Sequence, residues 1–264
     1  MRKPIITLLT DFGTKDHYVA SIKGVILSIN PECLLIDITH QVNRHDVREG
    51  AFLLANAYSF FPKGTIHLSV VDPGVGGTRK PILLVTQNHF FVGPDNGLFT
   101  FVAQKERVKK IVVLSKEKYF LPKVSKTFHG RDLFAPVAAH LSSGIKPGAF
   151  GDTINEIKRL RLQKPIIKEG KLLGEILHID TFSNLVSNIC EEILFGFTKG
   201  RPFVIRVGNK AIHGLKKGYW EGRQGQLIAL LGSGGFLEIS VREANAQRML
   251  KVKKGDPIEI RISK

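Results

Sequence analysis

The sequence contains only two cysteines, Cys33 and Cys190, which lie far apart along its 264 residues. Two cysteines exclude a disulfide-stapled scaffold and any four-cysteine zinc site, and so low a count fits a reducing compartment. Other metal-binding patterns are missing too, since the chain has no HExxH segment and no tight cluster of histidines and aspartates. We therefore expect chemistry that needs no metal.

Long hydrophobic runs are also absent. The chain begins with basic residues, but the apolar stretch that follows ends at Asp11, short of the roughly 7 to 15 residues of a secretory signal. No later run approaches the ~18 residues of a membrane span. Since 43% of the residues are apolar, the chain can bury a core. We expect a soluble, cytoplasmic protein without a membrane partner.

Acidic residues are scarce relative to basic ones. Lysine and arginine total 39 against 23 aspartates and glutamates, which gives a formal net charge of +16. This excess fits either attraction to nucleic acid or a solvated, lysine-rich surface. The basic residues are scattered, without interleaved aromatic residues or a nucleic-acid-binding motif, so the solvated surface is favoured and nucleic acid is the disfavoured partner.

The first part of the chain, residues 1–155, has the pattern of an α/β domain. Apolar runs typical of buried strands alternate with segments of helical periodicity, which predicts a mostly parallel sheet with helices on both faces. We expect Asp16 to cap the first helix. The predicted strands are residues 4–10, 34–39, 65–71, 82–86, 90–93 and 108–114, and the predicted helices are residues 16–29, 46–60 and 133–141.

The pattern changes after a charged segment at residues 152–165, which we interpret as a linker. Short apolar runs follow, separated by Gly, Lys and Asn, without a strong helical repeat. This is typical of a small all-β barrel or sandwich, which we place at residues 165–264. Its clearest predicted strands are residues 172–179, 202–207, 226–231, 236–241 and 257–262.

Two aspartates follow predicted strands of the first part, where ligands bind in open α/β sheets. Asp11 precedes a loop with Gly13, and its carboxylate could accept two ribose hydroxyls, although aspartate is also a common turn residue. Asp72 opens the loop DPGVGGTR, which ends at Arg79. The two side chains could form an ion pair, or the segment could be a simple turn with an exposed arginine.

Several catalytic motifs are missing. The loop at residues 72–79 lacks the ending of a phosphate-binding P-loop and does not match the dinucleotide fingerprint. No GxSxG elbow occurs, and neither cysteine has a catalytic signature. His129, in the segment FHGRD just before a predicted helix, is at a reasonable place either for an acid–base group or for an anion-binding turn.

Five segments taken together resemble one family along essentially the whole chain. The segments are LTDFGTKD (9–16), VDPGVGGTR (71–79), GPDNG (93–97), FHGRD (128–132) and IDTFSN (179–184). They are similar to the adenosine-forming S-adenosyl-L-methionine hydrolases, also called SAM hydroxide adenosyltransferases, which are related to the fluorinases and chlorinases. The resemblance implies an α/β domain followed by a β-rich domain, and a homotrimer with sites between subunits.

The resemblance also assigns roles to individual residues. It implies that Asp72, Arg79 and His129 position and activate a water molecule, and that Asp11, with Asp16 nearby, binds the ribose. In the second part, the residues expected to contact methionine and adenine are Asp180, Phe182, Asn184, Ser233 and Glu238. S-adenosyl-L-methionine is then the substrate, adenosine is a product, and no cofactor is needed.

The expected reaction is in-line attack of an intact water at C5′ of the substrate. Full ionisation of water by histidine would cost roughly 12 kcal/mol, because their pKa values are about 15.7 and about 6.5. Proton loss is therefore expected to accompany or follow formation of the C–O bond, with His129 as one candidate acceptor. Arg79 would orient Asp72 and cannot itself serve as a base.

Two other functions stay open. A halide could replace water as the nucleophile, but the halogenases have a serine where this chain has Gly130 and a tyrosine where it has Asp72, and they carry an insertion after the strand near Thr86. A second anion buried beside Asp72 would be costly. The other alternative is a sensor that binds adenosine or S-adenosyl-L-methionine without turnover.

Overall fold

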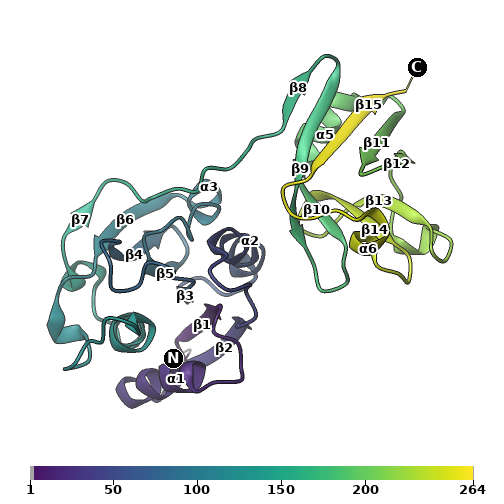
Figure 1. Ribbon diagram of the computed structural model, residues 1–264. Coiled ribbons are helices and arrows are strands. Elements are labelled where there is room, and N and C mark those ends of the chain that lie inside the picture. Colours follow the sequence, from purple (N-terminus) through teal and green to yellow (C-terminus); the bar gives the residue numbers. More distant parts are fainter. Residues whose placement is uncertain (1–2, 264) are drawn as a thin grey trace. The chain divides into compact units, whose positions relative to one another are not determined.

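The computed structural model describes residues 3–263, which divide into two compact units between Leu160 and Arg161 (Figure 1). The first unit is an α/β structure and the second is β-rich, so the predicted fold class is confirmed. Among the described residues, no helix has both the length and the apolar character required to cross a lipid bilayer.

A seven-stranded mixed sheet forms the centre of the first unit, in the order β2-β1-β3-β5-β4-β6-β7. Strands β2, β1, β3 and β5 pair in parallel, whereas β4, β6 and β7 join the sheet in antiparallel pairs. The antiparallel part begins because β5 returns directly from β4 through a short turn. The strands are β1 (Ile5–Thr10), β2 (Leu34–Thr39), β3 (Ile66–Val70), β4 (Pro81–Thr86), β5 (Phe90–Pro94), β6 (Val108–Val113) and β7 (Thr153–Ile154).

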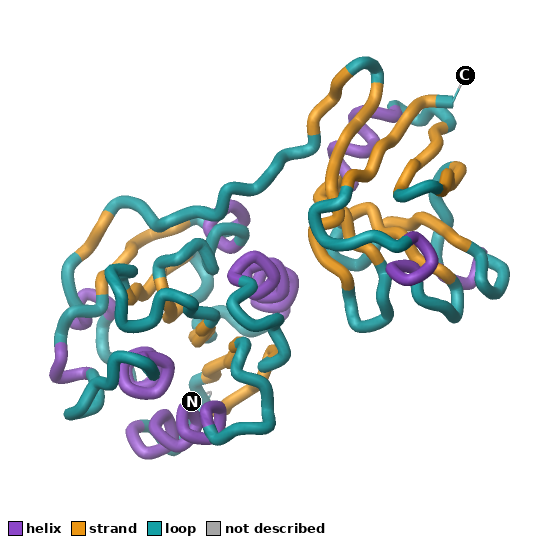
Figure 2. Tube along the Cα trace, viewed as in Figure 1, coloured by secondary structure: helices purple, strands orange, loops and turns teal. Residues whose placement is uncertain are grey.

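Helices cover both faces of this sheet, as the alternation of strands and helices predicted. Side chains of α1 (Tyr18–Ile29) and α4 (Ala135–Ser142) pack with Ile6 and Leu8 of β1 in one core. Those of α2 (Val47–Ala57) pack with Leu9 of β1 in the other core. Successive residues of a strand point to opposite faces, so one buried apolar strand can serve both cores. A short α3 (Val102–Lys105) completes the second layer (Figure 2).

The predicted cap of the first helix is wrong. The first main-chain hydrogen bond of α1 joins the Ser21 N–H to the His17 carbonyl, so the cap position falls on His17 and not on Asp16. The loop before α1 is bound instead to the segment after β2, because the Gly13 N–H donates a hydrogen bond to the His40 carbonyl. By contrast, Asp46, the first residue of the predicted second helix, is the cap of α2 and accepts a hydrogen bond from the Glu49 N–H.

The second unit is built on antiparallel strands in the order β12-β11-β15-β9-β10-β14-β13, with β8 paired to β9. Strands β12 and β13 at the two ends also contact each other, which gives the sheet a barrel-like form around one apolar core. The strands are β8 (Ile166–Lys168), β9 (Lys171–Ile179), β10 (Leu185–Cys190), β11 (Phe203–Val207), β12 (Lys210–His213), β13 (Leu227–Leu231), β14 (Phe236–Val241) and β15 (Pro257–Ile262).

Short helical segments occur that the hydrophobic pattern did not reveal. In the second unit these are α5 (Glu191–Thr198) and α6 (Ala246–Leu250), which are too short to display a helical repeat. Single helical turns are η1 (Tyr58–Phe60), η2 (Glu117–Tyr119), η3 (Gly130–Phe134), η4 (Pro147–Phe150) and η5 (Tyr219–Glu221). Of these, η3 is a π-helical turn that leads directly into α4.

His67 is a fully buried histidine on β3. It pairs across the sheet with Thr7, whose Oγ1 lies 2.7 Å from His67 Nδ1. Its Nε2 has no hydrogen-bond partner among the described residues. Burial, together with nearby His89, lowers the pKa of His67 to about 3. The imidazole therefore stays neutral in the folded protein over a pH range in which the unfolded chain takes up a proton.

Acidification is expected to destabilise the first unit through His67. An unfolded histidine titrates near pH 6.5, so between that pH and about 3 only the unfolded state binds the proton. The free energy of unfolding therefore decreases as the pH is lowered through this range. The loss between pH 7 and pH 5 is about 2 kcal/mol. Urea unfolding of the wild type and of His67→Gln at both pH values isolates this effect. Identical pH dependences in the two proteins would contradict it.

Candidate active site

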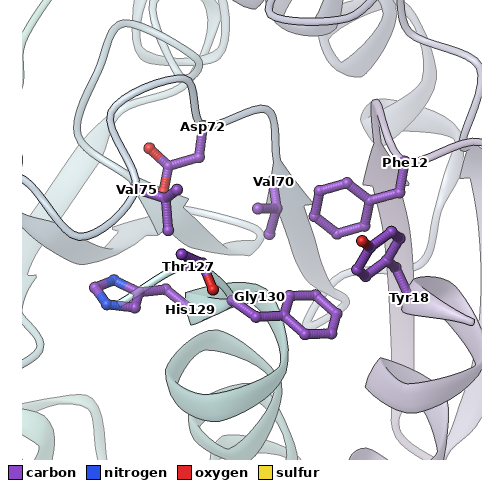
Figure 3. Close-up of a pocket in the computed structure, with 9 residues that line it drawn as sticks. Phe12, Tyr18, Val70, Asp72, Val75, Thr127, His129 and Gly130 are labelled. Carbon is purple, nitrogen blue, oxygen red and sulfur yellow. The ribbon is translucent and has the colours of Figure 1, made fainter. Parts of the chain in front are cut away.

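Two aspartates lie where parallel strands of the first unit end. Asp11 directly follows β1, and Asp72 stands two residues after β3, the neighbouring strand. The ends of adjacent parallel strands meet at one edge of a sheet, which is where ligands bind in open α/β folds. Figure 3 shows Asp72 at a pocket together with His129, which directly precedes η3.

Asp72 and Arg79 form a buried ion pair across the glycine-rich loop. Arg79 Nε and Nη2 donate to the carboxylate of Asp72 at distances from 2.6 to 3.1 Å. Only 4% of the Asp72 side chain and 7% of the Arg79 side chain are exposed. A pair held through two nitrogens in this way has a defined orientation. The alternative of a simple turn with an exposed arginine is wrong.

Arg79 also donates to His129, and this contact determines the tautomer of the imidazole. The Arg79 Nη2 lies 2.7 Å from His129 Nδ1. Guanidinium nitrogens are donors only, so Nδ1 must be the acceptor and the proton of the neutral ring must be on Nε2. Burial and the Arg79 charge lower the pKa of His129, against the opposing effects of Asp72 and Asp132. The neutral Nε2–H tautomer is therefore the form present near neutral pH.

A pocket of about 170 Å³ opens beside these groups. Asp72 and His129 line it, whereas Arg79 is not among its lining residues. The rest of the lining is mainly apolar and includes three aromatic side chains. The other lining residues are Phe12, Tyr18, Val70, Val75, Thr127, Phe128 and Gly130.

Asp132, which is fully buried, holds the loop that precedes His129 in place. Its carboxylate accepts hydrogen bonds from the Ser125 N–H at 2.8 Å and from Arg131 Nε at 2.6 Å. Burial alone would raise the pKa of Asp132, but these hydrogen bonds outweigh it and lower that pKa. The ionised carboxylate thus anchors the chain on both sides of Phe128 and His129.

Asp11 and Asp16 line a neighbouring hollow of about 360 Å³, formed by the loops after β1 and β2. One Asp11 oxygen accepts a hydrogen bond from the His45 N–H at 2.9 Å. Phe12 contributes to this hollow and also to the pocket of Asp72 and His129. The two predicted sites are therefore adjacent, with Phe12 between them.

In the second unit, three of the predicted residues form a single hydrogen-bonded cluster. The Asn184 N–H and Nδ2 donate to the Asp180 carboxylate at 2.8 and 3.0 Å. The Ser240 hydroxyl lies 2.7 Å from Asn184 Oδ1 and 2.9 Å from Glu238 Oε1. The Tyr219 hydroxyl donates to the same glutamate oxygen at 2.6 Å, and burial and Glu238 raise the pKa of Tyr219.

Two other predicted residues of this unit stand apart from the cluster. Phe182 is 79% exposed, and Ser233 is exposed in the turn that joins β13 to β14. Tyr219 and Ser240 were not predicted from the sequence. A signal for Ser240 exists, because it is two residues from Glu238 on β14 and must share its face. Tyr219 had no such signal, since it comes from a separate turn.

Comparison with known proteins identifies relatives along nearly the full chain. Residues 6–151 match the model of the SAM hydroxide adenosyltransferase N-terminal domain, and residues 174–259 match that of the C-terminal domain. A Methanocaldococcus jannaschii protein named (R)-S-adenosyl-L-methionine hydrolase is 38% identical, over 97% of this chain and 95% of its own. A fluorinase from an Actinoplanes species is 30% identical over 70% of this chain and 72% of its own.

A crystal structure of a Thermotoga maritima protein is similar to the whole chain. The sequences of the two chains are 40% identical, the TM-score is 0.91, and the match covers 97% of this chain and 99% of the other.

Among the described residues, no group of three or more histidines, cysteines, aspartates or glutamates is placed to hold a metal ion.

Gly76 determines how closely the loop of Asp72 and Arg79 can approach the segment before His129. Its φ is +73°, and a Cβ there would lie 2.2 Å from the Lys126 carbonyl oxygen. Gly64 has a φ of +87° with nothing within 4 Å of its Cβ position. We expect Gly76→Ala to destabilise the protein by about 1–3 kcal/mol more than Gly64→Ala, because only the former adds overpacking to backbone strain. Urea unfolding curves of the two variants test this, and equal losses would contradict it.

Proposed function

This chain belongs to the SAM hydroxide adenosyltransferase family, and we propose that it hydrolyses S-adenosyl-L-methionine to adenosine and L-methionine. The observation that carries the proposal is the hydrogen-bonded set of Asp72, Arg79 and His129 beside a pocket. Relatives named (R)-S-adenosyl-L-methionine hydrolase, which match nearly the full chain, support the same substrate.

His129 and Asp72 together offer a hydrogen-bond donor and an acceptor to a water molecule in the pocket. His129 Nδ1 is engaged by Arg79, so the Nε2–H is the free donor, and it would bind a lone pair of the water. Asp72 lines the same pocket and would accept a hydrogen bond from that water. A water held in this way keeps its second lone pair for attack at C5′ of the substrate.

Orientation supplies most of the acceleration in this proposal. The sulfonium is an excellent leaving group, and alignment of nucleophile and carbon can contribute about 7–11 kcal/mol. Prior ionisation of the water would cost roughly 12 kcal/mol with histidine as the base and is unnecessary. The reaction needs no cofactor, because the substrate carries its own leaving group.

Asp72 is the proposed proton acceptor. As the C–O bond forms, the attacking water becomes a protonated alcohol, which is far more acidic than water and can lose its proton to a carboxylate. His129 is poorly placed for this role, since its basic Nδ1 already accepts a hydrogen bond from Arg79. Arg79 balances the Asp72 charge and orients both partners.

The rest of the substrate requires groups beyond this pocket. Ligand pockets commonly measure about 300–1,000 Å³, whereas the pocket of Asp72 and His129 holds about 170 Å³. We assign the ribose to Asp11, with Asp16 nearby, since the His45 N–H engages only one Asp11 oxygen. Methionine and adenine are assigned to Asp180, Phe182, Asn184, Ser233 and Glu238 in a homotrimer with sites between subunits.

Water is favoured over a halide as the nucleophile. The Asp72 carboxylate lies at the pocket, and its charge is already balanced by Arg79, so no unmatched cation lines the pocket to bind an anion. A halide there would be desolvated beside a carboxylate, which is costly.

The other alternative is a sensor that binds the substrate without turnover. Formation of adenosine and methionine from S-adenosyl-L-methionine distinguishes an enzyme from such a sensor.

Asp72→Asn is expected to abolish most of the turnover. The substitution removes the proton acceptor and leaves Arg79 without its counter-charge, so kcat should fall by about 10²–10⁴-fold. The assay incubates purified protein with S-adenosyl-L-methionine and separates adenosine and methionine by chromatography. Asp152→Asn, a change at an exposed aspartate, is the matched control. Undiminished turnover in Asp72→Asn would refute the assignment, and binding without turnover in the wild type would refute the hydrolase.

The pH profile of turnover reports the protonation state of His129. Protonation would break the hydrogen bond from Arg79 and place two cations side by side, so only the neutral ring supports the reaction. Since the pKa of His129 is lowered from 6.5, the acid limb of kcat should lie below pH 6.5. Initial rates from pH 4.5 to 8.5 measure it. An acid limb centred above pH 6.5 would argue against a neutral Nε2–H donor.

A further inference from the structure

Three aromatic side chains line one part of the pocket and contact one another. The Phe12 and Phe128 rings lie 5.9 Å apart between centroids, and the Tyr18 ring lies 5.1 Å from Phe128 and 5.8 Å from Phe12. They come from the loop after β1, from the start of α1 and from the segment before η3. We call Phe12, Tyr18 and Phe128 the aromatic wall.

The pocket has no unmatched negative charge. Asp72 is the only carboxylate among the residues that line it, and Arg79 balances its charge. The imidazole of His129 is neutral in the tautomer that Arg79 imposes. The whole chain carries a formal charge of +16, which repels cations at long range. Carboxylates within the pocket therefore do not explain how a positively charged substrate is bound there.

In-line displacement determines on which side the positive charge lies. The nucleophile and the leaving group are on opposite sides of the reacting carbon, so the sulfur lies away from the water held by Asp72 and His129. In Figure 3 these two residues and Val75 lie on one side of the pocket, and Phe12 and Tyr18 lie on the other, with Val70 between them. The sulfonium of a substrate aligned for attack therefore faces the aromatic wall.

We propose that the aromatic wall recognises the positive charge of the sulfonium through the π faces of its rings and so selects the charged substrate over the neutral thioether. This inference rests on the proposed function. Aromatic faces carry partial negative charge and bind cations without needing a carboxylate. The guanidinium of Arg131 already lies 4.9 Å from the Phe128 ring centre, so Phe12 and Tyr18 contribute the larger share.

The charge distribution along the reaction predicts which kinetic constant responds. During attack by neutral water, positive charge moves from sulfur to oxygen while the substrate stays in the same pocket. The aromatic wall therefore contacts the full positive charge in the ground state and a smaller part of it in the transition state, because the oxygen that gains charge lies on the opposite side of the reacting carbon. An interaction that is not strengthened in the transition state lowers KM without raising kcat.

The test compares S-adenosyl-L-methionine with S-adenosylhomocysteine, the neutral thioether with the same skeleton. Initial rates give kcat and KM for the former, and competitive inhibition gives Ki for the latter. In Tyr18→Leu and Phe12→Leu we expect KM to rise by roughly 2- to 30-fold, with a much smaller change in Ki and in kcat. Tyr18→Phe, which keeps the ring, should retain the wild-type ratio of Ki to KM.

Phe60→Leu is the matched control, because Phe60 is 86% exposed and does not line the pocket. Equal rises in KM and Ki in the two leucine variants would overturn the inference, since the rings would then supply apolar contact alone. A fall in kcat at constant KM would overturn it as well. If the wild type produces no adenosine, the proposed function itself fails. If the leucine variants turn over the substrate with the wild-type ratio of Ki to KM, only the role of the aromatic wall fails.

Discussion

The guanidinium of Arg79 is the interaction on which the site depends. It donates to the carboxylate of Asp72 through two nitrogens and to His129 Nδ1 through one of them, so a single planar group orients both side chains. It also neutralises Asp72, which allows that carboxylate to be almost completely buried beside an apolar pocket. Without this arrangement, neither the tautomer of His129 nor the direction of the acceptor oxygens would be defined.

The fold brings these groups together from distant parts of the chain. Asp72 follows β3 and His129 precedes η3, and the two segments approach so closely that Gly76 has no room for a side chain beside Lys126. Asp132 holds the second segment from inside the unit through Ser125 and Arg131. A site made of two loops is thus supported by one backbone contact and one buried carboxylate, both outside the pocket.

The net charge of the chain does not match a positively charged substrate, whereas the charges of the residues that line the pocket do not oppose one. The excess of lysine and arginine says nothing about the ligand, since the residues that line the pocket balance their own charges. In the proposed reaction a cation moves next to a neutral ion pair and three aromatic rings. This environment also disfavours an anionic nucleophile, which separates water from halide chemistry without any change of fold.

Local patterns in the sequence determined the fold class, most strands and the long helices, because burial imposes a periodicity of two or of about three and a half on apolar residues. The resemblance in five motifs likewise indicated the family from the sequence alone. The antiparallel pairing of β4 with β6, the cap at His17 and the short α5 and α6 were decided by tertiary packing. So were the contact of Arg79 with His129, the aromatic wall and the joining of Tyr219 and Ser240 to Glu238. These depend on distances between residues far apart in the chain, which no local pattern encodes.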